Sequence, residues 1–97
     1  MLTSKQRAQL KAIAAGLSPI FQIGKGGIND NMCRQLDETL EARELIKIST
    51  LETSPVEAKE AAEQLSKVLS ADVVVVIGRK IVLYRESKDN KQIVLVK

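Results

Sequence analysis

The chain has 97 residues, 44% of them apolar, and its 15 basic and 12 acidic side chains give it a formal charge of +3. A chain of this length supports one hydrophobic core, so we expect residues 1–97 to form a single domain. The sequence contains no histidine and only one cysteine, Cys33, which excludes an intramolecular disulfide and a zinc site built from these two residue types.

The first predicted element is a helix from about Thr3 to Ala15. Thr3 and Gln6 have the spacing of a capping box, in which each side chain binds the backbone amide of the other residue, and Gly16 marks the C-terminal end. Apolar residues recur at intervals of three and four, which predicts one buried stripe. This stripe consists of Leu10, Ile13, Ala14 and Leu17.

A strand is predicted over residues 19–24, followed by a glycine-rich turn and a second helix over residues 30–44. Asn29 is a favourable N-cap, and the spacing of Ile28 and Cys33 is typical of a hydrophobic staple. The side chains expected to face inward are Met32, Cys33, Leu36 and Leu40. Those expected on the outer face are Asp37, Glu38, Glu41 and Glu44.

The next two predicted elements are a strand over residues 45–51 and a third helix. Ser54 as N-cap, Pro55 at the first helical position and Glu57 at the third predict where this helix begins. It is expected to last to about Ser70. Its inward side chains are expected to be Ala58, Ala61, Ala62, Leu65, Val68 and Leu69.

The uninterrupted apolar run over residues 73–77 is typical of a strand buried on both faces or nearly so. Gly78 and Arg79 predict a turn into a strand over residues 80–84, and residues 93–96 are a candidate for a further short edge strand. Helices that alternate with strands predict a mostly parallel arrangement in which the last hairpin supplies an antiparallel strand. We therefore expect an α/β domain with a four-stranded mixed sheet and packed helices.

The sequence lacks the motifs that would indicate an enzyme. Without histidine it has neither the commonest general base nor the commonest metal ligand, and it contains no nucleophile elbow and no Walker-type phosphate loop. We therefore expect a binding protein with no cofactor and no metal. No apolar run approaches the roughly 18 residues of a membrane span, and the N-terminal residues lack a signal peptide's apolar core, so we expect a cytoplasmic protein.

Charge is distributed unevenly along the chain. Residues 1–34 carry five cations and one acid, residues 35–70 four cations and eight acids, and residues 71–97 six cations and three acids. Such segregation favours a basic face turned toward a polyanion and an acidic face turned away from it. Arg79 and Lys80 lie at the predicted hairpin turn, where an ordinary exposed charge is the expected interpretation.

The segment Gly24-Lys25-Gly26-Gly27 is the most informative motif, because glycines let the backbone turn tightly and approach a ligand without an intervening Cβ. Free amides at the start of the following helix favour an anion, and Lys25 adds a positive charge. KH domains hold the nucleic-acid backbone with a G-x-x-G loop of this kind. Glycines also serve simply to fold many strand-to-helix turns, so the motif alone leaves both roles open.

Basic side chains lie along one edge of the first predicted helix. Arg7 and Lys11 are four residues apart, and together with Lys5 they would extend a phosphate-binding track if this helix packs beside the glycine loop. An ordinary solvated face is the alternative. Only Phe21 and Tyr84 are aromatic, so the stacking platform of many RNA-binding domains is missing, and RNA binding is expected to depend on backbone and shape.

Five short segments, which follow one another over nearly the whole chain, carry a family resemblance. They are Leu2-Thr-Ser-Lys-Gln-Arg7, Pro19-Ile-Phe-Gln-Ile-Gly-Lys-Gly-Gly27, Glu41-Ala-Arg-Glu-Leu-Ile-Lys-Ile48, Val76-Ile-Gly78 and Ile81-Val-Leu-Tyr-Arg85. Together they resemble the YhbY-type CRM domain, the chloroplast RNA splicing and ribosome maturation domain, in its stand-alone bacterial form. Their order and spacing make this resemblance much more specific than the glycine loop alone.

The resemblance implies a fold similar to the C-terminal domain of translation initiation factor three. It also implies RNA binding through the loop from Gly24 to Gly27 and through nearby basic residues. Bacterial members are associated with precursors of the large ribosomal subunit, so the implied partner is large-subunit ribosomal RNA or its precursor particle. We expect no membrane partner and a monomeric protein.

Other functions remain open from the sequence. Within the same class, the RNA could be an intron or a regulatory RNA. A protein-interaction adaptor would use the acidic second helix on a basic partner, and its binding would be insensitive to ribonuclease. A nucleotide-binding enzyme would use the glycine loop for a phosphate and would have to achieve turnover without histidine.

Overall fold

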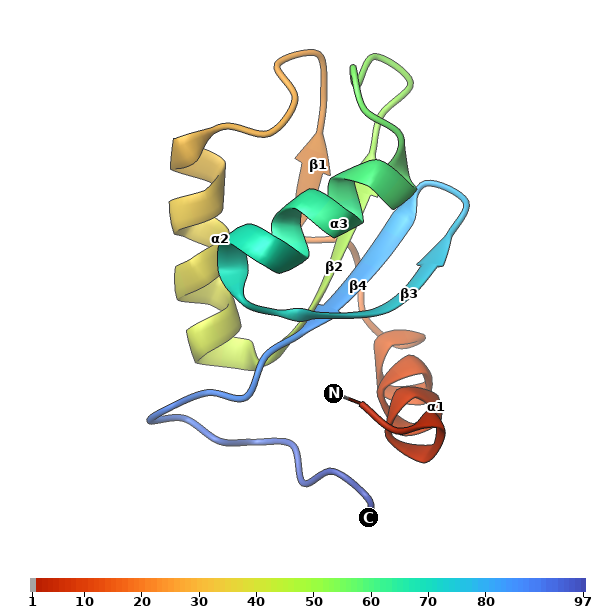
Figure 1. Cartoon of the computed structure of the whole chain (residues 1–97), viewed down its shortest axis with the longest axis vertical. Coiled ribbons are helices and arrows are strands. Elements are labelled where there is room, and N and C mark those ends of the chain that lie inside the picture. Colours follow the sequence, from red (N-terminus) through yellow and green to blue (C-terminus); the bar gives the residue numbers. More distant parts are fainter. Residues whose placement is uncertain (1) are drawn as a thin grey trace.

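The computed structural model describes residues 2–97, which form three helices and four strands in the predicted order (Figure 1). The helices are α1 (Ser4–Ala14), α2 (Asp30–Arg43) and α3 (Ala58–Leu69). The strands are β1 (Phe21–Ile23), β2 (Leu45–Thr50), β3 (Asp72–Ile77) and β4 (Lys80–Tyr84). They form one sheet in the order β1-β2-β4-β3, which confirms the predicted four-stranded mixed sheet of an α/β fold.

The sheet owes its mixed character to β4. β1 pairs with β2 in parallel, whereas β4 lies between β2 and β3 and is antiparallel to both. The three strands that follow helices therefore run in one direction, as predicted. The expectation that residues 73–77 are buried on both faces holds only in part. β4 takes the inner position next to β2, which leaves β3 at the edge, and Ile77 is 64% exposed.

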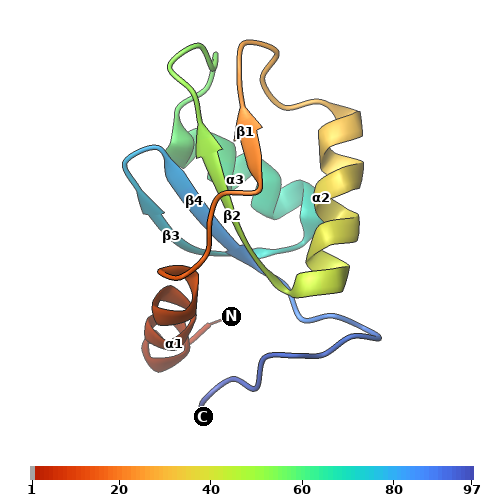
Figure 2. The same ribbon diagram turned by 180° about the vertical axis from the view of Figure 1, so that it is seen from behind.

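Helices cover both faces of the sheet but not equally. α2 and α3 pack on one face, and α1 packs on the opposite face, nearer the end that holds both termini (Figures 1 and 2). The alternation of side chains along each strand divides the core between these layers. Ile46, Ile48, Ile81 and Leu83 belong to the cluster under α2 and α3, and Leu45, Val74, Val82 and Tyr84 belong to the cluster under α1.

Two predicted helix starts are confirmed by their hydrogen bonds. The amide of Thr3 donates to Gln6 Oε1 at 3.0 Å and the amide of Gln6 donates to Thr3 Oγ1 at 3.1 Å, which completes the capping box of α1. Asn29 Oδ1 accepts a hydrogen bond from the amide of Met32 at 2.8 Å at the start of α2. The capping residues in the sequence were therefore sufficient to predict where α1 and α2 begin.

The predicted start of the third helix is wrong. α3 begins at Ala58, after Glu57, which makes no capping hydrogen bond through its side chain. The Ser54 hydroxyl instead accepts from the amide of Val56 at 3.2 Å and donates to the Val56 carbonyl at 2.7 Å. Ser54 therefore closes a local turn, and the helix starts one turn later than its capping signal indicated.

Parts of the predicted apolar stripes are exposed. Leu10 and Ala14 are buried as expected, but Ile13 and Leu17 of the same stripe remain 40% and 38% exposed. On α3, Val68 is 63% exposed, while the other predicted inward residues are buried. The helical spacing therefore predicts a wider apolar stripe than the one that each helix buries.

The C-terminal residues follow an extended path without forming the candidate edge strand at residues 93–96. Side chains of α1 hold this segment instead: Gln6 Nε2 donates to the Val96 carbonyl at 2.9 Å, and Gln9 Nε2 donates to the Val94 carbonyl at 2.8 Å. These hydrogen bonds satisfy backbone groups that a sheet neighbour would otherwise pair. None of the helices formed by residues 2–97 has the length and apolar composition needed to cross a membrane.

Candidate nucleic-acid interface

The glycine segment forms a tight turn between β1 and α2. The amide of Gly27 donates to the carbonyl of Gly24 at 2.9 Å, which closes the turn around Lys25 and Gly26. Gly27 has φ +67°, in the left-handed region that favours glycine. The turn lies at one end of the long axis of the molecule, beside the connection between β2 and α3 (Figure 1).

The glycines of this turn differ in how much space surrounds them. A Cβ on Gly27 would lie 3.1 Å from Pro55 Cγ, and a Cβ on Gly24 would lie 3.5 Å from Leu51 Cδ1. A Cβ on Gly26 would meet nothing within 4 Å. Gly27 is therefore required by the fold itself, whereas Gly26 leaves an open approach to the backbone at the tip.

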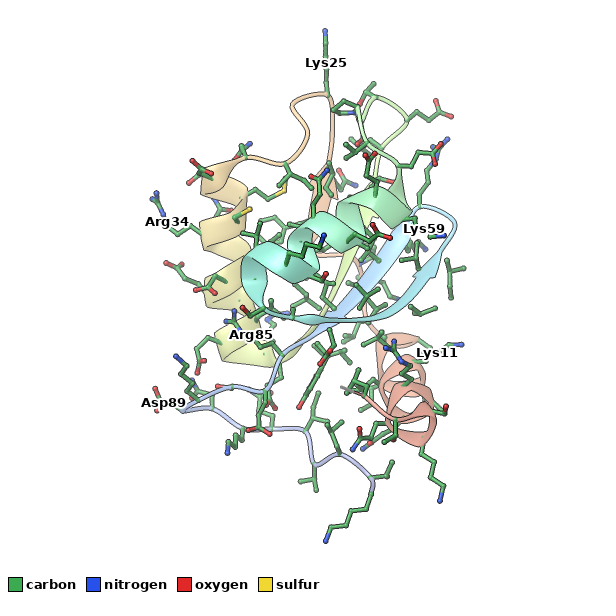
Figure 3. All side chains as sticks on the ribbon, viewed as in Figure 1. Lys11, Lys25, Arg34, Lys59, Arg85 and Asp89 are labelled. Atoms are coloured by element: carbon green, nitrogen blue, oxygen red, sulfur yellow. The ribbon has the colours of Figure 1, made fainter. Side chains whose placement is uncertain are left out.

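The tip of the turn carries unused donors. Lys25 is exposed and points away from the body of the molecule (Figure 3), and it forms no ion pair with any residue from 2 to 97. Within the same residues the backbone amides of Lys25 and Gly26 donate no hydrogen bond. One ammonium group and two amides can therefore bind an anion at this tip without breaking existing bonds.

The start of α2 itself is less suited to an anion than the sequence suggested. The side chain of Asn29 already accepts the hydrogen bond of one first-turn amide, that of Met32. Asp30 places a carboxylate in the first turn, where it interacts favourably with the helix dipole and repels another anion. The donors suited to a phosphate are consequently those of the turn.

The basic residues of α1 lie apart from the glycine loop. α1 packs on the other face of the sheet and toward the opposite end of the molecule, so the helix does not extend a continuous track from the loop (Figures 1 and 3). Lys5 and Lys11 are exposed, whereas Arg7 is half-buried. Arg7 Nη1 donates to the carbonyls of Val73 and Val74, the latter at 3.1 Å, and so links α1 to β3.

The acidic face predicted on the second helix is largely occupied by the protein's own backbone. Glu44 was expected on the outer face, but it is fully buried at the C-terminal cap of α2, with φ +66°. Burial raises its pKa, but hydrogen bonds from the amides of Ser87, Ile93 and Gln92 outweigh this effect and lower the pKa on balance. The spacing of residues in the helix does not predict the burial of Glu44, because the amides that bind its carboxylate come from the C-terminal segment.

Two more acids of α2 have partners in the same region. Glu41 accepts hydrogen bonds from the Ser87 hydroxyl and from the amide of Lys88, the latter at 3.1 Å. Asp37 Oδ1 lies 2.6 Å from Arg85 Nη1, in a salt bridge on the surface. Glu38 is thus the acid of the predicted outer face that stays exposed without such a partner within residues 2–97. Two of the four predicted acids, Glu41 and Glu44, are therefore bound by backbone amides of the C-terminal segment.

Two basic residues were missed as candidates. Lys47 on β2 and Lys80 on β4 lie near Lys11, on the side of the sheet that α1 covers only in part. The sequence alone favours an ordinary exposed charge at the hairpin turn for Lys80. The strand alternation of residues 45–51 could have placed Lys47 on this side, but the pairing of β2 with β4 was needed to bring Lys80 beside it.

Comparison with known proteins identifies the family. The family model described as the CRS1 / YhbY (CRM) domain matches residues 2–85. This chain belongs to the CRS1/YhbY family. The CRM-domain match includes the glycine loop, all three helices and all four strands described above.

Relatives and a solved structure agree with this assignment. The Bacillus subtilis protein named "Probable RNA-binding protein YqeI" is 54% identical over 95 residues, which are 98% of this chain and 99% of the relative. A Methanocaldococcus jannaschii protein, also named a probable RNA-binding protein, is 35% identical over 86 residues, 87% of this chain and 63% of the relative. The solution structure of the hypothetical protein SAV1595 from Staphylococcus aureus is 54% identical, with a TM-score of 0.82, and the match covers 99% of this chain and 100% of that one.

Proposed function

We propose that this CRM-domain chain binds RNA and that the loop from Gly24 to Gly27 holds a phosphate of the RNA backbone. The observation that carries the proposal is the free tip of the loop, where Lys25 and two backbone amides have no partner within residues 2–97. Gly26 leaves space for the RNA to reach these donors. The names of the relatives support RNA as the ligand.

Backbone contacts are expected to dominate this binding. Phe21 is partly buried against the main core and Tyr84 is buried under α1, so neither offers an exposed ring for base stacking. Lysine contacts to phosphate release counterions, so log affinity should fall linearly with log salt concentration. With three to five phosphate contacts, the slope would be on the order of −2 to −4.

The α1 residues form a second proposed contact region. Lys5 and Lys11 are exposed and free to bind phosphate, while Arg7 contributes mainly by holding α1 against β3. An RNA that touches both regions must extend along the molecule, whose longest dimension is 39 Å. Such an extended contact favours a structured RNA over a short oligonucleotide.

The biological role we propose is assistance in the assembly of the large ribosomal subunit. The support is the family itself and the fit of a phosphate-binding loop to large structured RNAs. We propose that residues 1–97 act as one domain, as a monomer in the cytoplasm, without catalysis. An intron or a regulatory RNA is the alternative partner, and the acidic-helix adaptor is disfavoured because Glu41 and Glu44 bind the chain's own backbone.

The experiment that tests this role is a tagged pull-down after crosslinking, followed by sequencing of the bound RNA. Enrichment of large-subunit ribosomal RNA or its precursors would support ribosome assembly. Enrichment of an intron or of particular messengers would favour the alternative. If no RNA crosslinks and a protein partner remains bound after ribonuclease treatment, the RNA-binding proposal itself fails.

A further inference from the structure

Acidic residues are unevenly distributed between the two sides of the sheet. α1, β1, β2 and β4 contain no aspartate or glutamate and β3 contains one, Asp72, whereas α2 and α3 together carry six of the twelve acids. α1 covers only the lower part of its face in Figure 2, and on this side the strands contribute one acid, Asp72, which lies opposite Tyr84 at the far end of β3 from Ile77. A polyanion that contacts this side away from Asp72 meets no charge repulsion from these elements.

A groove lies on this side, where α1 meets β2, β3 and β4. Its volume is about 410 Å³, within the range of roughly 300–1,000 Å³ that is typical of small-ligand sites. Three lysines surround it, and small or branched apolar side chains form its floor. The lining is Lys11, Lys47 and Lys80 with Ala14, Ala15, Val75, Ile77 and Val82.

The lysines and the apolar floor are both available to a ligand. Lys11, Lys47 and Lys80 form no salt bridge with any of the residues that the structure describes. Ile77 is 64% exposed although it lies in a strand. A large apolar side chain ringed by free ammonium groups suits a ligand that is flat and apolar on its face and anionic at its ends.

The basic lining continues past the groove in both directions. Lys11 and Val75 also line a neighbouring depression that contains Arg7, and Lys47 also lines one that contains Arg43. No aspartate or glutamate lines any of these three depressions among residues 2–97. A chain of phosphates can therefore enter and leave the central groove along basic side chains.

We propose that this groove receives an unpaired nucleotide of the RNA, with its base against Ile77 and Val75 and its flanking phosphates at Lys11, Lys47 and Lys80. This proposal depends on the proposed RNA binding. It also specifies which class of RNA structure the protein binds. Bases inside a duplex are stacked and hide their faces, so only a loop, a bulge or a single strand can supply this base. The aliphatic floor offers no hydrogen-bond partner to base edges, so little sequence preference is expected.

The test compares two RNAs of equal length, a hairpin with an unpaired loop and a blunt duplex. The charge variant is Lys47→Gln with Lys80→Gln, and its matched control is Lys67→Gln with Lys88→Gln on the side of α2 and α3. The apolar variant is Ile77→Ala, and its control is Val68→Ala, because Val68 is 63% exposed and lies on α3. Thermal melting of each variant checks that the fold is retained.

The charge variant should bind the looped RNA about tenfold more weakly than the parent, with a salt slope reduced by about 1 per lysine removed. Ile77→Ala should weaken binding of the looped RNA about threefold and leave the duplex unaffected, as expected for a lost base contact. Both controls should bind within about twofold of the parent, because rim charges and exposed side chains outside a contact contribute little.

The possible outcomes distinguish a failure of the groove proposal from a failure of the proposed function. Parental affinity in both groove variants would overturn the groove while leaving RNA binding through the glycine loop intact. Equal losses for the looped RNA and the duplex would also overturn it, since the lysines would then act only on backbone charge. A parent protein that binds neither RNA would overturn the proposed function and the groove together.

Discussion

Glu44 and Ser87 are joined by a buried hydrogen bond, in which the Ser87 amide donates to Glu44 Oε2 at 2.8 Å across 43 residues of sequence. The other carboxylate oxygen accepts from the amides of Gln92 at 2.6 Å and Ile93 at 2.8 Å. One carboxylate at the end of α2 thus holds both ends of the polar loop that follows β4. This anchoring allows Ile93 to pack against the core under α1.

Replacing Glu44 by glutamine should destabilise the protein. The side-chain amide of the new glutamine would present N–H donors to backbone N–H donors, so at least one buried amide would lose its acceptor. We expect the free energy of unfolding to fall by about 2–3 kcal/mol in a urea titration. Glu38→Gln on the exposed side of the same helix is the control and should change it by less than about 0.5 kcal/mol. Equal effects of the two substitutions would contradict the anchoring role.

Glu41 makes the same region sensitive to acid. Hydrogen bonds from the Ser87 hydroxyl and from the amides of Lys88 and Asp89 lower the pKa of Glu41 to about 2. The unfolded chain, with an ordinary glutamate pKa of roughly 4.3, therefore binds a proton at a higher pH than the folded protein does. The stabilisation is complete above about pH 5 and is lost as the pH falls toward about 2.

A Glu41→Gln variant isolates this effect, because it removes the titrating group and keeps a similar shape. The parent should be more stable than the variant at neutral pH, and the difference should shrink steadily between about pH 5 and pH 2. Unfolding by urea at a series of pH values measures the difference directly. A difference that stays constant over this range would show that Glu41 does not stabilise the protein as a carboxylate.

Two neighbouring glycines should respond differently to alanine. Gly27→Ala forces a Cβ into a residue with φ +67° and within 3.1 Å of Pro55 Cγ, so the free energy of unfolding should fall by about 1–2 kcal/mol. Gly26→Ala meets nothing within 4 Å and should be neutral or slightly stabilising. Weaker RNA binding by a fully folded Gly26→Ala variant would support a close approach of the RNA backbone to the main chain at Gly26.

The sequence was sufficient for features that depend on near neighbours. The capping partners of Thr3 and Asn29 lie three residues away, and both helix starts were predicted correctly. The order of helices and strands follows from periodicity, which local spacing also determines. The predicted start of α3 was wrong because a serine hydroxyl can either cap a helix or close a local turn, and the Ser54 hydroxyl bonds to Val56 in a turn.

Features that depend on distant residues could not be predicted from the sequence. The burial of Glu44 requires donors that lie 43 residues or more along the chain. β3 is as apolar as an inner strand because helices cover parts of both its faces. It nevertheless pairs only with β4 and therefore lies at the edge of the sheet. Lys47 and Lys80 lie near each other because β2 pairs with β4, and the periodicity of the sequence does not predict this strand order.

If the glycine loop binds the RNA backbone, replacing Lys25 by glutamate should weaken the affinity for structured ribosomal RNA. Lys67→Glu on α3 is the control, since it has the same change in charge on an exposed lysine far from the loop's tip. We expect Lys25→Glu to weaken binding about five- to tenfold, to lower the magnitude of the salt slope by about 1 and to leave the thermal midpoint unchanged. The control should stay within about twofold of the parent. Equal affinity of Lys25→Glu and the control, with both proteins folded, would contradict RNA binding by the loop and reduce it to a structural turn.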